Sequence, residues 1–236
     1  MNLLALDTAT EACSVALLTG DRLVERSEVM PRRHAEHVLP MAEAVLAEAG
    51  LSRSQVDGIA VGRGPGAFTG VRLGVSVAQG LAAALDRPVV TVSSLAALAM
   101  EAPRDDATVL AVIDARMGEV YAGAFRHEAD GLVRPINEEC VCAPDVLTVP
   151  DASVWSVVGT GWGVYADVIG TRLASRPRWA EAQRYPQARH VARLAAPAFA
   201  AGRTLAPEEA LPVYLRNKVA QTLRERGKPQ PNPDVL

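Results

Sequence analysis

Two stretches of this chain share one construction. Residues 3–18 read LLALDTATEACSVALL, and residues 109–125 read VLAVIDARMGEVYAGAF. Each has an apolar run, an aspartate (Asp7 or Asp114), a short turn and a second apolar run. This pattern is typical of a β-hairpin whose first strand ends in a carboxylate. The recurrence of the unit predicts two related lobes that face each other across a cleft.

Composition excludes several classes of protein. Hydrophobic residues make up 49% of the 236 residues, enough for a sizeable core, and the net charge of −3 argues against a protein that binds nucleic acid mainly through its overall charge. Three cysteines without dense spacing do not form a disulfide framework and indicate a reducing compartment. The chain begins with a strand-like run and no basic region, so we expect no signal peptide and a cytoplasmic location.

The first part of the chain predicts an α/β lobe. Its patterns read as three strands, a helix, a strand, a helix, a strand and a short helix. After the first hairpin these elements are expected near residues 22–30, 33–49, 57–61, 68–85, 88–95 and 94–101. A polar stretch with a proline at 102–106 marks the lobe boundary, so we expect lobes over 1–103 and 104–236.

The second lobe offers weaker signals. After the hairpin at 109–125 we expect strands near 140–142 and 154–158, a glycine turn at 159–163 and a helix over 187–201. The last nine residues are expected to be disordered.

The two hairpin aspartates are the first candidates for chemistry. Asp7, with Thr8 and Thr10 in the following turn, could position a phosphate or a metal-bound water, and Asp114 would be its counterpart across the cleft. The alternative is that both carboxylates only cap tight turns. The glycine-rich GRGPGAFTG at 62–70 is not a phosphate-binding Walker loop, because no Gly-Lys-Ser/Thr follows. It brings backbone N–H groups and a helix N-terminus together, so it is either an anion site or a structural turn chosen for close packing.

Metal chemistry has little support in the sequence. His34 and His37 are three residues apart rather than four, and no third ligand is evident. Cys140 and Cys142 have no second pair of ligands nearby. We therefore expect no metal site, and no stoichiometric transition metal in the purified chain.

Four stretches together resemble one family. In order they are LLALDTATEACSVAL, VGRGPGAFTGVRLGVSVAQGLA, VIDARMGEVYAGAF and PVYLRNKVA, and they are similar to the TsaB (YeaZ) family. The resemblance implies an α/β fold of the actin/Hsp70/sugar-kinase (ASKHA) type, with two lobes that each hold a mixed β-sheet and flanking helices.

The resemblance also implies a function. The family serves N6-threonylcarbamoyladenosine synthesis at position 37 of tRNA, as a non-catalytic subunit beside a catalytic paralogue, TsaD, and a P-loop ATPase, TsaE. No cofactor is then required by the isolated chain, ATP would act within the complex, and tRNA would be bound through the complex. Such sequences once carried a peptidase label, but this sequence shows no arrangement of catalytic residues typical of a protease.

The resemblance places partner contact on the first lobe's two long helices. Gly70, Gly74 and Ala78 form a smooth face on the second helix that lets another backbone approach closely, and such a face needs a partner if it is exposed. The same helices would suit a homodimer of the isolated chain. The expected interface residues are His34, His37, Val38, Met41, Val45, Val71, Arg72, Gly74, Val75, Ala78 and Gln79.

Two other functions remain open from the sequence. One is a small kinase or ATPase that uses Asp7 and Asp114, which nucleotide binding by the isolated chain would reveal. The other is a tRNA-binding module that acts through the basic C-terminal segment, which holds Arg216, Lys218, Arg224, Arg226 and Lys228.

Overall fold

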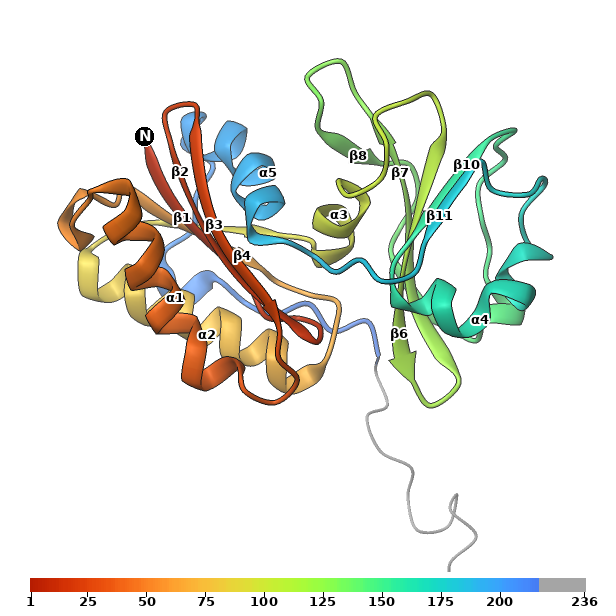
Figure 1. The fold of residues 1–236 in the computed structure, drawn as a ribbon, viewed down its shortest axis with the longest axis horizontal. Coiled ribbons are helices and arrows are strands. Elements are labelled where there is room, and N and C mark those ends of the chain that lie inside the picture. The colour runs from red at the N-terminus through yellow and green to blue at the C-terminus, as the bar shows by residue number, and fades with distance from the viewer. Residues whose placement is uncertain (217–236) are drawn as a thin grey trace, which may run out of the picture.

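A computed structural model describes residues 1–216 as two lobes that lie side by side (Figure 1). The sheet of the first lobe has the strand order β3-β2-β1-β4-β5. β1 is antiparallel to β2 and parallel to β4, so the sheet is mixed. Its strands are β1 (Asn2–Asp7), β2 (Ala12–Thr19), β3 (Arg22–Val29), β4 (Gly58–Gly62) and β5 (Val89–Val92).

Helices cover both faces of this first sheet. Figure 1 shows α1 (His34–Ala49) and α2 (Phe68–Leu85) on one face and α5 (Ala188–Ala200) on the other. Each face closes over its own cluster of buried aliphatic side chains. Within the described residues, α2 is the one helix long and apolar enough to cross a membrane, and here it packs on β4 and β1.

The second lobe repeats the arrangement of the first. Its sheet has the order β11-β10-β6-β7-β8, and β9 also pairs with β7. β6 is antiparallel to β7 and parallel to β10, as β1 is to β2 and β4. The strands are β6 (Thr108–Arg116), β7 (Glu119–His127), β8 (Val133–Pro135), β9 (Cys140–Cys142), β10 (Trp155–Val158) and β11 (Trp179–Glu181). The duplicated hairpin and the two-lobed mixed-sheet fold are therefore confirmed.

Shorter helices complete the described residues. α3 (Ser94–Ala99) packs on β6, β7 and α5, and α4 (Thr160–Gly170) packs on β6. The sequence reading missed α4, because Gly161 and Gly163 in its first turn resemble a loop. Three single-turn helices are η1 (Arg53–Gln55), η2 (Pro144–Val146) and η3 (Pro207–Glu209).

The domain prediction of 104–236 for the second lobe is wrong at its C-terminal side. α5 packs on β1, β2 and β4 of the first sheet, because its apolar face (Val191 and Ala195 among others) fills the side of that sheet left open by α1 and α2. The segment after α5 stays with the first lobe, where Leu205 bridges to Val89. The predicted disorder of the last nine residues lies outside the described residues.

Candidate functional site

Asp7 is fully buried, and both of its oxygens accept hydrogen bonds. The backbone N–H of Ala9 donates to Oδ1 at 2.9 Å, and the Ser94 hydroxyl donates to Oδ2 at 2.7 Å. Burial raises the pKa of this carboxyl, and the two hydrogen bonds oppose the rise. A Cβ on Gly62 would lie only 1.8 Å from Oδ2, so the strand beside Asp7 has room only for glycine. Asp7 thus joins the end of β1 to the first turn of α3.

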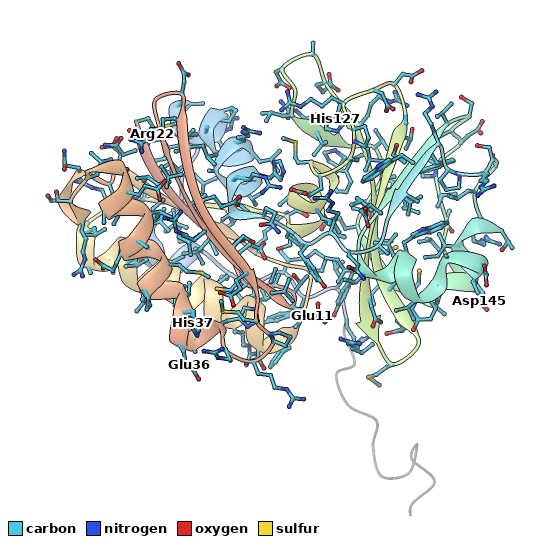
Figure 2. All side chains as sticks on the ribbon, in the orientation of Figure 1. Glu11, Arg22, Glu36, His37, His127 and Asp145 are labelled. Carbon is cyan, nitrogen blue, oxygen red and sulfur yellow. The ribbon has the colours of Figure 1, made fainter. Side chains whose placement is uncertain are left out.

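Asp114 has a more open setting at the equivalent point of the second lobe. Its Oδ1 accepts the backbone N–H of Arg116 at 2.9 Å, and its Oδ2 pairs with the Arg116 guanidinium at 2.9 Å. The same guanidinium contacts Glu11 in the β1–β2 turn at 2.7 Å. Figure 2 shows Glu11 on the side of the first lobe that faces the second. A salt bridge therefore connects the two hairpins.

Thr8, the third nucleotide candidate, is also engaged. Its side-chain hydroxyl donates to the Gly70 carbonyl at 2.7 Å and so ties the β1–β2 turn to α2. The capping interpretation accounts for the contacts of Asp7, Thr8 and Asp114. A nucleotide role for these three residues stays a prediction.

The small-residue stripe of α2 faces its own lobe. A Cβ on Gly70 would lie 2.1 Å from the Thr8 carbonyl oxygen, and one on Gly74 would lie 2.6 Å from Thr8 Oγ1. Ala78 is fully buried beside them. The glycines are needed because the β1–β2 turn approaches the helix, so the face is not exposed and the condition under which it would need a partner is not met.

Besides His34, six of the expected interface residues are buried within the first lobe. The Val75 side chain is only 2% exposed, because it packs into the core between the helices and the sheet. Direct contact with a partner is therefore not available to these residues in this structure. They are Val38, Val45, Val71, Gly74, Val75 and Ala78.

A different part of the same two helices is open. A groove of about 580 Å³ runs between α1 and α2, with Leu39 and Pro40 on one side and Leu81, Ala84 and Leu85 on the other. Leu39 is 46% exposed. At its rim the Arg53 guanidinium pairs with Glu43 at 2.6 Å. The single interface residues expected from the sequence do not include these, although Leu39, Pro40 and Leu81 lie on the two helices to which partner contact was assigned.

The chain is similar to known proteins over nearly its whole length. A family model described as "TsaD: tRNA N6-adenosine threonylcarbamoyltransferase" matches residues 27–222. The Escherichia coli K12 protein named "tRNA threonylcarbamoyladenosine biosynthesis protein TsaB" is 41% identical over 225 residues, which cover 93% of this chain and 96% of that one. This chain belongs to the TsaB family.

A second relative and a solved structure support the same family assignment. The Haemophilus influenzae protein of the same name is 39% identical over 230 residues, covering 93% of this chain and 95% of that one. The solved structure "YeaZ from Pseudomonas aeruginosa" is 50% identical, with a TM-score of 0.83, and the match covers 91% of this chain and 99% of that one. The resemblance to the TsaB (YeaZ) family and its ASKHA-type fold is confirmed.

Two expected interface residues in this TsaB-family chain bind its own C-terminal segment. Arg72 donates from Nε to the Tyr214 hydroxyl at 2.7 Å, and its guanidinium lies 3.8 Å from the centre of the Phe68 ring. Gln79 donates from its side chain to the Ala210 carbonyl at 3.1 Å. Both therefore hold the segment after η3 against α2.

The remaining expected interface residues lie along α1. His34, at the start of the helix, is buried. His37 is half-buried and its Nε2 lies 2.7 Å from the Arg33 guanidinium; Figure 2 labels it beside Glu36. Met41 is partly buried against the core. The partner role of these side chains stays a prediction.

The candidate metal ligands are dispersed. In the described range, 1–216, no three His, Cys, Asp or Glu side chains are grouped so that they could hold a metal ion. Cys140 and Cys142 lie with their sulfurs 4.0 Å apart, and burial raises the pKa of both thiols, that of Cys142 to about 12. Thiols of such high pKa are poor nucleophiles and weak metal ligands at neutral pH.

Proposed function

We propose that this chain is a non-catalytic subunit in the synthesis of N6-threonylcarbamoyladenosine at position 37 of tRNA. In this role it would bind a TsaD-type catalytic paralogue, act with a TsaE-type P-loop ATPase in the cytoplasm, contact tRNA through the complex and require no cofactor on its own. The observation that carries the proposal is the 41% identity to a TsaB protein across 93% of the chain.

The contacts of the hairpins support a non-catalytic role. Asp7 is shielded from solvent, and both of its oxygens serve hydrogen bonds inside the first lobe. Asp114 and Glu11 share the Arg116 guanidinium, so both carboxylates at the facing turns are engaged within the chain. A kinase or ATPase would need these carboxylates to face a nucleotide and its metal ion. We therefore favour the subunit over the enzyme.

The groove between α1 and α2 supports a helical partner. Its walls are aliphatic, and the Glu43–Arg53 pair at the rim leaves no net charge there. This chain itself matches the TsaD family model, so a TsaD-type paralogue would carry a similar pair of helices. Two such pairs can pack face to face as a four-helix bundle. Two copies of this chain would use the same groove when the paralogue is absent.

A charge in the groove tests this proposal. Leu39→Glu places a carboxylate in the middle of the expected contact, where an unpaired desolvated charge costs several kcal/mol. Because Leu39 is 46% exposed in the free chain, the variant should fold normally. We expect loss of co-elution with the paralogue in size-exclusion chromatography and loss of tRNA modification in a reconstituted assay, with an unchanged circular dichroism spectrum.

The control is the same substitution at a distant apolar surface position. Val146, in η2 of the second lobe, is 61% exposed, and Val146→Glu should leave assembly and modification intact. If a folded Leu39→Glu protein binds the paralogue as tightly as the Val146→Glu control does, the groove is not the interface.

A further inference from the structure

The segment after η3 passes from the first lobe to the second. On the first lobe, Val213 donates its backbone N–H to the Arg63 carbonyl at 2.9 Å. Ala210 and Tyr214 accept the hydrogen bonds from α2 described above. Figure 1 shows this blue segment running from the first lobe to the lower end of β6. The segment therefore reaches the second lobe while it stays bound to the first.

On the second lobe the segment binds the β6–β7 turn. The Arg216 guanidinium donates to the carbonyl oxygens of Ala115 at 3.1 Å and of Arg116 at 3.3 Å, and it pairs with the Glu119 carboxylate. The Arg216 side chain is only 17% exposed, so salt and water screen this pair less than a surface ion pair. One guanidinium thus ties the segment to both strands of the hairpin.

The turn that Arg216 binds has an unfavourable backbone conformation. Arg116 and Met117 both lie in the left-handed region, with φ of 61° and 58°. This region is disfavoured for residues that carry a Cβ. The hydrogen bonds from Arg216 to the carbonyls at the start of the turn help to hold it there. Strained segments that outside contacts hold in place are frequent where a protein switches between two arrangements.

The lobes are joined more firmly where the chain crosses between them. It crosses through α3 and again through the linker from β11 to α5. Leu95 and Leu98 of α3 pack in one buried apolar cluster with strands of the second lobe. The Glu101 carboxylate, after α3, pairs with His190 of α5 at 2.7 Å. These two crossings, with their packed side chains, form a natural hinge.

At the β6–β7 turn the lobes meet around a cavity instead. A pocket of about 210 Å³ lies between the start of α2 and the side chains of Met117 and Tyr121 on the second lobe. The Arg216 contacts and the Arg116–Glu11 salt bridge join the lobes here. Opening the lobes at this point would break polar contacts and would leave the apolar cluster at α3 intact.

We propose that the C-terminal segment is a latch between the two lobes. With Arg216 bound, the β6–β7 turn is held against the first lobe. When Arg216 is released, the second lobe rotates about the two chain crossings and the gap beside the turn widens. The function proposed above does not depend on this motion, because every residue that lines the groove between α1 and α2 belongs to the first lobe.

Hydrogen exchange of the full-length chain, followed by mass spectrometry, tests the latch. Arg216→Gln removes the charge and the forked contacts but keeps a polar side chain. We expect about tenfold faster exchange in the β6–β7 turn and in residues 9–11 of the β1–β2 turn, since a hydrogen bond to a charged group contributes this much or more. Arg216 does not contact residues 9–11, so faster exchange there reports separation of the lobes. Exchange within β1 and β10 should stay at wild-type rates, and small-angle X-ray scattering should show a larger radius of gyration.

Arg22→Gln is the matched control. Arg22 also donates to a backbone carbonyl, that of Glu48 at 3.1 Å, but both residues lie in the first lobe. This variant should keep wild-type exchange in both turns and the wild-type radius of gyration.

Two more variants complete the test. Glu119→Ala should change exchange in the same direction as Arg216→Gln but less, because the carbonyl contacts of Arg216 remain. The double variant should match Arg216→Gln alone, because the two side chains form one contact. The proposal is overturned if Arg216→Gln keeps the wild-type radius of gyration and wild-type exchange in residues 9–11. Equally faster exchange throughout both lobes also overturns it, because that result indicates a general loss of stability.

Discussion

Adding one methyl group to α2 should have opposite effects at two of its glycines. At Gly80 a new Cβ meets no atom within 4 Å, whereas at Gly70 it would lie 2.1 Å from the Thr8 carbonyl oxygen. Both glycines are in the same helix, so the comparison holds helix and residue type constant. The pair tests directly whether the small-residue stripe is pressed against the β1–β2 turn.

The magnitudes follow from these distances. Gly80→Ala should stabilise the fold by about 0.5–1 kcal/mol, because alanine loses less backbone entropy in a helix. Gly70→Ala requires α2 and the turn to separate by about 1 Å to restore an ordinary C···O contact of about 3.3 Å. That movement also disturbs the 2.7 Å hydrogen bond from Thr8 to the Gly70 carbonyl. Overpacking of this kind costs about 1–3 kcal/mol.

Thermal unfolding by circular dichroism measures both changes. In a chain of this size each kcal/mol shifts Tm by about 2–4 °C, so Gly80→Ala should raise Tm by a few degrees and Gly70→Ala should lower it by up to about 10 °C. A Gly70→Ala protein at least as stable as Gly80→Ala would refute the reasoning. The stripe would then be loosely packed and open to a partner, as the sequence alone suggested.

Three further predictions concern buried ionisable groups. Burial opposes the charge of Glu101, but His190, Arg189 and Arg184 hold its pKa below the usual 4.5, and burial lowers the pKa of His190 below 6.5. In the folded state both groups bind protons less readily than in the unfolded chain, so Tm should fall as pH drops from 7 through 6.5 and again below 4.5. His190→Gln should flatten the first of these falls. Superimposable profiles of Tm against pH for wild type and His190→Gln would contradict this. Asp7→Ala leaves the Ala9 N–H and the Ser94 hydroxyl without their acceptor, so it should cost about 1–3 kcal/mol by urea unfolding. We also expect little ATP turnover by the wild-type chain; robust turnover lost in Asp7→Ala at unchanged stability would favour the kinase alternative.

The strands and long helices of the first lobe were predictable from local patterns. Alternating and continuous apolar runs gave β1 to β5, and the stripe with Val38 and Val45 gave α1. A proline is disfavoured in a helix interior, yet the structure includes Pro40 inside α1, which already begins at His34. Such signals are short-range, so a single sequence contains them.

Long-range packing was not predictable in the same way. The helix over 187–201 was expected, yet its apolar face gave no sign that it covers the first sheet rather than the second. The glycines of α2 were read correctly as a site of close approach, but the approaching backbone is the Thr8–Ala9 turn of the same lobe rather than a partner. A stripe of small residues on a helix indicates how closely a neighbouring backbone can approach, but it does not indicate which segment that neighbour is.

The packing of these glycines bears on how the groove could bind a partner. Because Gly70 and Gly74 let the β1–β2 turn touch α2, the inner face of that helix is fixed by backbone contacts and by the Thr8 hydrogen bond. The outer face, with Leu81 and Leu85, is then presented at a set distance from Leu39 on α1. A surface held in its binding geometry before association loses less entropy when it binds. The inner stripe would thus act on partner affinity indirectly, by positioning the groove rather than by contact.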